Sequence, residues 1–158
     1  MLKILLAEDN PIDEVALTQY LKNNLGVEFE SESVKTCKEM LRVLDDGKNY
    51  DIIILDHILE DEQSLKYIDK IIAKSNKAQV IVLSGQTDIS VCIQYLNAGV
   101  YAYLNKEANA FKNLIKNINE ILVKKAGNSS YLKISKNNVY LIVGLTILAV
   151  IALYLVIK

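Results

Sequence analysis

The stretch "KILLAEDNPIDEVALTQYL", residues 3–21, contains a change of hydrophobic period that decides the fold. Residues 3–7 form a short apolar run, which is typical of a strand buried in a parallel sheet. Asn10 is a good helix N-cap, and Pro11 suits the first helical position because it has no N–H to leave unpaired. The apolar positions that follow at helical spacing are Ile12, Val15, Ala16, Leu17, Tyr20 and Leu21. The stretch therefore predicts a strand followed directly by a helix.

The same strand-to-helix unit recurs along the next hundred residues. The predicted strands are 3–7, 27–33, 51–55, 79–84 and 100–104, and the later helices cover roughly 36–46, 63–73, 88–97 and 108–125. Such alternation predicts an α/β fold in which a five-stranded parallel sheet carries helices on both faces. The expected strand order is 2-1-3-4-5, which places the first and third strands side by side.

Composition narrows the function classes. The chain has 158 residues and a formal net charge of -1, so it lacks the basic excess of a nucleic-acid-binding protein. Its two cysteines, Cys37 and Cys92, have no metal-binding spacing, and free thiols in a reducing compartment are the simplest interpretation. The first ten residues do not have the pattern of a signal peptide.

Charged and hydroxyl residues follow the predicted strands. Glu8 and Asp9 follow the first strand, Asp56 the third, and Ser84 and Lys106 the ends of the last two. Because the carboxyl ends of parallel strands meet at one edge of the sheet, we expect these groups to converge. Neighbouring carboxylates repel unless a cation is bound, and oxygen ligands suit Mg²⁺. The alternative is that the acids cap helices and face water, but all five together indicate the chemistry of an aspartyl phosphate.

The motifs "LAEDNPID", "IIILDHIL", "VIVLSGQ" and "YAYLNK" resemble, in this order, the receiver domain of two-component response regulators. The resemblance covers residues 1–125 and implies a doubly wound, flavodoxin-like fold. It also implies that Asp56 accepts the phosphoryl group with Lys106 and Ser84 holding it, and that Tyr103 is an aromatic switch. The implied Mg²⁺ ligands are Asp9, Asp56, the backbone carbonyl of Ile58 and, through water, Glu8.

Several residues depart from the family pattern. Glu107 follows Lys106 where the family usually has proline, and Glu60 and Ser64 stand where it usually has proline and glycine. We expect apolar Ile58 to slow self-hydrolysis, because it does not orient water toward a phosphoaspartate. Strand alternation points His57 away from Asp56.

The C-terminal residues have a different composition. Residues 126–138 are polar, whereas residues 139–157 contain no charge and are long enough to span a bilayer as one helix. Four lysines precede the segment, Lys124, Lys125, Lys133 and Lys136, and only Lys158 follows it. The positive-inside rule therefore predicts a tail-anchored, single-pass protein of the inner (cytoplasmic) membrane, with its receiver domain in the cytoplasm.

These patterns predict a single-domain, membrane-tethered bacterial response regulator. The resemblance implies that it takes phosphate on Asp56 from a histidine kinase or a histidine phosphotransfer protein. It also implies contact with a downstream protein through the fourth helix, fifth strand and fifth helix. The alternative is a receiver-fold adaptor that recruits partners to the membrane without being phosphorylated. Enzymatic activity beyond its own phosphotransfer and dephosphorylation is disfavoured, because an aspartyl phosphatase needs a second acid where Ile58 stands. A nucleotide-binding protein is disfavoured because no glycine-rich loop follows the first strand.

Overall fold

The computed structural model describes residues 1–60 and 62–127, and residues Met1–Asn119 form one compact unit. The elements are β1 (Leu2–Ala7), α1 (Pro11–Asn24), β2 (Phe29–Val34), α2 (Cys37–Asp45), β3 (Ile52–Asp56), β4 (Ile58–Leu59), β5 (Glu62–Gln63), the 3₁₀ helix η1 (Ser64–Tyr67), α3 (Ile68–Lys74), β6 (Gln79–Ser84), α4 (Ile89–Asn97), β7 (Ala102–Asn105) and α5 (Ala110–Gly127). The five predicted strand-to-helix units are therefore present.

Five strands form a parallel sheet in the order β2-β1-β3-β6-β7. Counted within this sheet alone, the strands follow the predicted order 2-1-3-4-5. The difference from the prediction is a two-stranded antiparallel ribbon, β4-β5, which lies between the third and fourth strands in the sequence. Its strands have two residues each, too few for a hydrophobic period to be visible in the sequence.

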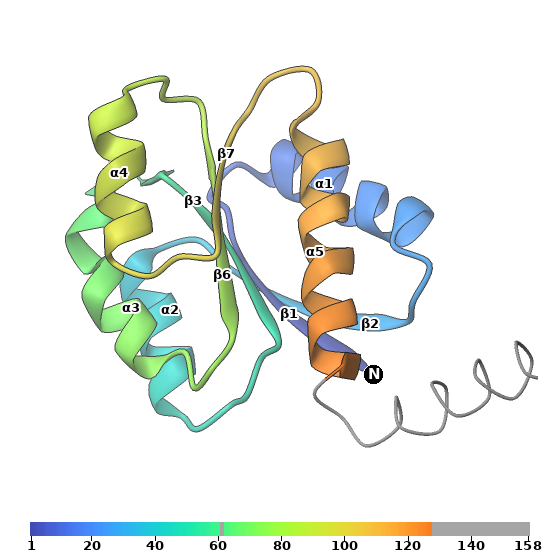
Figure 1. The fold of residues 1–158 in the computed structure, drawn as a ribbon. Coiled ribbons are helices and arrows are strands. Elements are labelled where there is room, and N and C mark those ends of the chain that lie inside the picture. Colours follow the sequence, from blue (N-terminus) through green and yellow to red (C-terminus); the bar gives the residue numbers. More distant parts are fainter. Residues whose placement is uncertain (61, 128–158) are drawn as a thin grey trace, which may run out of the picture. The chain divides into compact units, whose positions relative to one another are not determined.

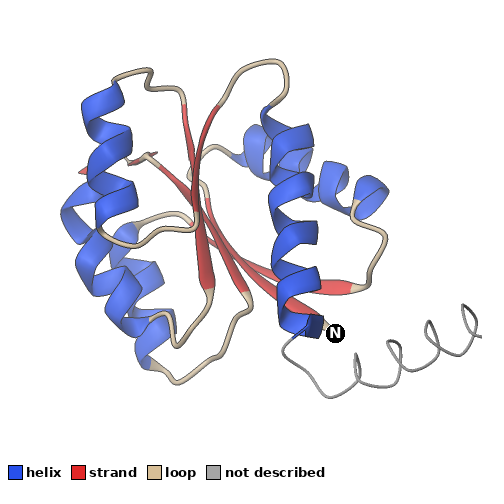
Figure 2. Cartoon of the chain, in the orientation of Figure 1, coloured by secondary structure: helices blue, strands red, loops and turns tan. Residues whose placement is uncertain are grey.

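The sheet lies between two layers of helices, with α1 and residues 110–119 of α5 on one face and α2, α3 and α4 on the other (Figures 1 and 2). Residues Ile52–Leu55 of β3 are each 0% exposed, as expected for a central strand covered on both faces. Alternate residues such as Leu5, Ile53 and Val82 pack toward the α2–α3–α4 layer. β2 is an edge strand, which explains its polar, alternating sequence.

The start of α1 is as predicted, but its apolar face is not. The side chain of Asn10 accepts a hydrogen bond from the Ile12 N–H at 2.9 Å, and Pro11 is the first helical residue. Ile12 and Val15, predicted as part of the buried stripe, are 77% and 66% exposed. The first turn of α1 lies beside the carboxyl ends of the strands, so only the later turns, with Leu17, cover the sheet.

The predicted membrane segment, residues 139–157, and all but the first two residues of the predicted linker lie outside the described residues. Within residues 1–60 and 62–127, no helix combines the length and the apolar character that crossing a bilayer requires.

Candidate functional site

Three carboxylates converge where β1 and β3 end. Glu8 and Asp9 follow β1, Asp56 is the last residue of β3, and one carboxylate oxygen of each lies within 4.8 Å of the other two. β1 and β3 are neighbours in register, with Ala7 opposite Leu55, which brings the three acids together. The side chain of Glu8 is only 3% exposed and that of Asp56 12%. The predicted convergence of these acids is confirmed.

Lys106, just beyond β7, reaches into this acidic cluster. Its Nζ lies 2.5 Å from Asp56 Oδ2, 3.0 Å from Glu8 Oε2 and 3.6 Å from Asp13 Oδ2. Burial alone would lower the pKa of Lys106, but its hydrogen bonds to Asp56 and Glu8 outweigh burial and raise it. Burial, reinforced by the charge of Asp56, raises the pKa of Glu8 above its ordinary value, although Lys106 opposes the shift. One cation thus faces more negative charge than it can balance.

Backbone N–H groups hold the carboxylates in place. Asn10 N donates to Glu8 Oε1 at 3.2 Å, Ile58 N to Asp56 Oδ1 at 3.2 Å, and Glu60 N to Asp9 Oδ2 at 3.0 Å. Glu60 has a φ of 48°, in the left-handed region. A proline at this position would lack both the N–H and the accessible φ, so the departure from the family pattern allows the bond to Asp9.

Hydroxyl-bearing residues lie on the other side of Asp56. Ser84, at the end of β6, is fully buried, and its Oγ accepts a hydrogen bond from Gln86 N at 2.9 Å. Tyr103 on β7 is half-buried, and its hydroxyl donates to the Gln86 carbonyl at 3.2 Å. Burial raises the pKa of Tyr103. Ser84 and Tyr103 are therefore linked through one residue of the loop that follows β6.

Two residues whose importance the sequence did not reveal lie behind the site. Tyr95 of α4 and Ser64 are both 0% exposed, and they join His57 in a buried hydrogen-bonded cluster. The sequence favoured packing for Tyr95 but indicated no polar partner. Ser64 stood out only as a departure from the family's glycine, and that departure was the available signal. His57 does point away from the carboxylates, as predicted, toward Tyr95.

The three acids offer hard oxygen ligands, a donor set that suits Mg²⁺. Lys106 offers a compact positive charge beside the same oxygens. An aspartate oxygen at the centre of such a cluster can act as a nucleophile toward phosphorus, because the surrounding positive charge offsets the charge that develops on the phosphoryl oxygens.

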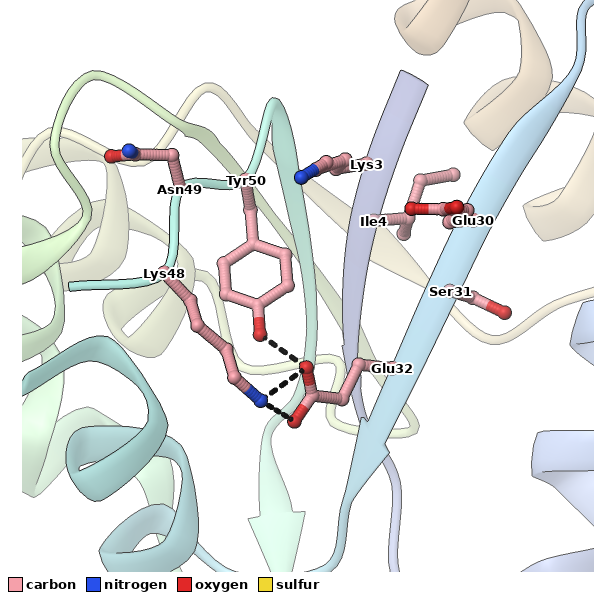
Figure 3. A pocket seen from close by; sticks show the side chains of 8 residues that line it. All are labelled: Lys3, Ile4, Glu30, Ser31, Glu32, Lys48, Asn49 and Tyr50. Carbon is pink, nitrogen blue, oxygen red and sulfur yellow. Dashed lines mark hydrogen bonds and ion pairs between the residues drawn. The ribbon is translucent and has the colours of Figure 1, made fainter. Parts of the chain in front are cut away.

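A second hollow, of about 370 Å³, lies near the amino-terminal halves of β1 and β2 and the loop before β3 (Figure 3). The charged residues that line it are Lys3, Glu30, Glu32 and Lys48. Glu32 is neutralised within the hollow, because Lys48 Nζ donates to both of its oxygens at 2.8 and 3.0 Å and the Tyr50 hydroxyl donates at 2.7 Å (Figure 3). This hollow has no surplus charge to attract an ion.

Residues 4–119 match the model of the response regulator receiver domain family. A cyclic di-GMP phosphodiesterase of Thermotoga maritima is 26% identical over 106 residues, which make up 67% of this chain and 27% of that protein. The chain thus matches only about a quarter of that curated relative's length.

Solved structures show the same fold. A CheY-like receiver domain protein of Methanospirillum hungatei is similar at 22% identity and a TM-score of 0.70, over 82% of this chain and 99% of that one. A response regulator of Burkholderia pseudomallei, solved with a phosphorylated aspartic acid, a calcium ion and citrate, is similar at 22% identity and a TM-score of 0.64, over 82% of this chain and 76% of that one.

Proposed function

The chain belongs to the response regulator receiver family, and on this premise we propose that it is a phosphorylation-dependent signalling switch whose acceptor is Asp56. The observation that carries the proposal is the contact of Lys106 Nζ with Asp56 Oδ2, 2.5 Å apart, inside the cluster made by Glu8 and Asp9. A receiver needs this combination of one nucleophilic carboxylate, one fixed cation and spare oxygen ligands.

The phosphoryl donor is a phosphohistidine of a histidine kinase or of a histidine phosphotransfer protein. A carboxylate oxygen of Asp56 attacks the phosphorus in line, the P–N bond breaks, and the imidazole leaves with the electron pair. The product is an acyl phosphate on Asp56. Lys106 moves its charge from the free carboxylate to a phosphoryl oxygen, and the buried Ser84 hydroxyl donates to another.

Glu8, Asp9, Asp56 and the carbonyl of Ile58 are the groups that would hold Mg²⁺. The ion supplies positive charge that offsets the charge of the transferring phosphoryl group. The surplus of acids over cations at this edge supports the assignment, because Lys106 alone does not balance them. The phosphorylated aspartate and the calcium ion in the Burkholderia pseudomallei relative are consistent with it.

Output is by contact with another protein. Movement of Ser84 toward the phosphoryl group would change its hydrogen bond with Gln86 N. Because Gln86 also accepts from the Tyr103 hydroxyl, Tyr103 would move too and so remodel the face formed by α4, β7 and α5. Three apolar side chains already lie exposed on α4, namely Ile89, Ile93 and Leu96. Such a face supports recognition by a partner protein.

We also propose that residues 139–157 anchor the receiver to the cytoplasmic face of the inner membrane, which would concentrate it near membrane-bound kinases. The support is the uncharged run itself and the lysines that precede it. In membrane fractions washed with alkaline carbonate, the full chain should be retained and a chain ending at residue 138 released. Release of the full chain would contradict the anchor.

Incubation of the full chain with acetyl phosphate and Mg²⁺ tests the switch chemistry. The expected result, by intact-protein mass, is one phosphate adduct that disappears with a chelator and in Asp56→Asn. A folded protein without an adduct would contradict the proposal and favour an adaptor that works without phosphorylation. An adduct that persists in Asp56→Asn would place the acceptor elsewhere.

A further inference from the structure

Behind the carboxylate site lies a buried polar cluster, the Tyr95 cluster, which consists of Tyr95, Ser64 and His57. The Tyr95 hydroxyl is 2.8 Å from Ser64 Oγ and 2.8 Å from His57 Nδ1. Ser64 Oγ also donates to the backbone carbonyl of Asp56 at 2.8 Å. All three residues are at most 2% exposed. Through Ser64, the α4 residue Tyr95 is thereby connected by hydrogen bonds to the backbone of Asp56, the proposed acceptor.

Counting donors gives this chain of hydrogen bonds a direction. Ser64 has one hydroxyl proton, and it faces two backbone carbonyls, that of Asp56 at 2.8 Å and that of His57 at 3.2 Å, so Ser64 accepts from the Tyr95 hydroxyl. The Tyr95 oxygen is then free to accept from His57 Nδ1–H. Each group in the chain is satisfied, which makes the arrangement rigid.

The ring of Tyr95 contacts the proposed switch residue. The Tyr95 and Tyr103 ring centroids are 5.5 Å apart with an interplanar angle of 35°, and the His57 ring meets Tyr95 edge-on at 5.7 Å. Tyr103 is thus packed against a side chain that cannot rotate without breaking two buried hydrogen bonds. Aromatic pairs at this separation attract each other beyond their simple burial.

We propose that Tyr95 is a positioning residue that couples the backbone at Asp56 to Tyr103: its hydroxyl is held by Ser64 and His57, and its ring holds the ring of Tyr103 in the inward position. The inference rests on the proposed function, because it gives Tyr103 the role of the switch. It predicts that the inward state is already populated before phosphorylation. Ser64 makes the coupling possible in this chain, since glycine, which the family usually has there, carries no hydroxyl.

The test places one fluorotyrosine at residue 103 of the full chain and records its ¹⁹F spectrum without a phosphoryl donor. Tyr95→Phe keeps the ring and removes the hydroxyl, and Ser64→Ala removes the hydroxyl that Tyr95 bonds. If one variant fails to fold, the other still provides the test. Losing one such hydrogen bond should shift the ratio of inward to outward Tyr103 about two- to tenfold toward outward. The double variant should shift it no further than Tyr95→Phe, because both changes break the same link.

Matched controls come from the rest of the chain. Tyr50, 9% exposed, also has a hydrogen-bonded hydroxyl, but in the second hollow (Figure 3), and Ser75, 5% exposed, donates to the Ile72 carbonyl at 2.9 Å. Tyr50→Phe and Ser75→Ala should leave the Tyr103 spectrum unchanged. An unchanged spectrum in both cluster variants, equal shifts in the controls, or fully additive shifts in the double variant would each overturn the inference.

Adding acetyl phosphate and Mg²⁺ to the same samples separates this inference from the proposed function. If the wild-type chain takes up no phosphate, the proposed function fails, while the spectrum recorded beforehand still decides whether Tyr95 positions Tyr103. If it is phosphorylated but the cluster variants behave as the controls do, only the positioning role fails.

Discussion

Two lysine–glutamate pairs in the described part of the chain, Lys48 with Glu32 and Lys106 with Glu8, differ in what surrounds them. In the second hollow, Lys48 and Glu32 are 50% and 38% exposed and balance each other, with Tyr50 as a further donor (Figure 3). At the carboxyl ends of the strands, Lys106 and Glu8 are 26% and 3% exposed. There the same lysine also faces Asp56 and Asp13.

The contrast shows that an ion pair alone does not mark a reactive site. What marks one is an excess of buried carboxylates over cations, as around Lys106. Hydrogen bonds from Lys48 and Tyr50 lower the pKa of Glu32, whereas burial raises the pKa of Glu8. The first carboxylate is stabilised in its charged form, and the second is held charged at a cost. A metal ion or a phosphoryl group can change the free energy of the second arrangement much more than that of the first.

Replacing the two lysines breaks the comparison most directly. Lys106→Met should slow formation of the Asp56 adduct from acetyl phosphate by roughly 100-fold, because a fixed charge at the transferring group is lost. Lys48→Met should leave the rate unchanged. Mass spectrometry over time measures both, and equal rates for the two variants would contradict the assignment of Lys106.

At the carboxylate site, the N–H that binds Asp9 belongs to Glu60, a non-glycine residue at positive φ. Glu60→Pro removes the N–H that binds Asp9 and forbids the φ of 48°, so it should destabilise the fold by about 2 kcal/mol.

Glu60→Gly is the matched control, because glycine keeps the N–H and accepts the positive φ. It should be neutral or slightly stabilising in urea unfolding of the full chain. A proline variant as stable as the glycine variant would show that the Glu60–Asp9 bond contributes nothing.

Ile58, which is 40% exposed beside the site, gives a smaller effect. Ile58→Asn adds a polar side chain that can orient water toward a phosphoaspartate, so the phosphorylated state should decay severalfold faster. The decay of the adduct after removal of acetyl phosphate measures this. An unchanged lifetime would refute the expectation that an apolar residue slows hydrolysis here.

The smallest effect is expected at Glu32. Its pKa is lowered from 4.5 in the folded chain, so below that value the unfolded chain takes up the proton first. The stability that Glu32 contributes is therefore present above pH 4.5 and is lost as the pH falls through its folded pKa. Glu32→Gln should cost less than about 1 kcal/mol at pH 7, since the pair is exposed. Urea unfolding of both proteins at pH 7 and pH 3 should show a larger difference at pH 7 than at pH 3.

Most of the fold was predictable because its signals are local. The β6 strand was predicted with its observed bounds, and the start of α1 at Pro11 follows from the N-cap at Asn10. The β4-β5 ribbon was not predicted, since two-residue strands carry no period. The exposure of Ile12 and Val15 was also missed, because helical spacing does not reveal how far a helix extends past its sheet.

The site divides in the same way. Glu8, Asp9, Asp56, Ser84 and Lys106 were predicted to meet because each follows a strand, and parallel strands end at one edge. Asp13 was not expected near Lys106, and the contact depends on where the first turn of α1 lies relative to the end of β7. The roles of these residues in phosphotransfer stay a prediction until an adduct is measured.

The sequence by itself determined the five strands of the parallel sheet, the family to which the chain belongs and the acids that stand at the strand ends, because periodicity and position after a strand are properties of neighbouring residues. Only the tertiary structure decided that Tyr95 bonds Ser64 and His57, which lie 31 and 38 residues away along the chain. Contacts at such separations depend on how α4 packs against the loop after β3, and no local pattern encodes that packing. The partners of the Tyr95 hydroxyl, and with them the link to Tyr103, are therefore a property of the folded molecule.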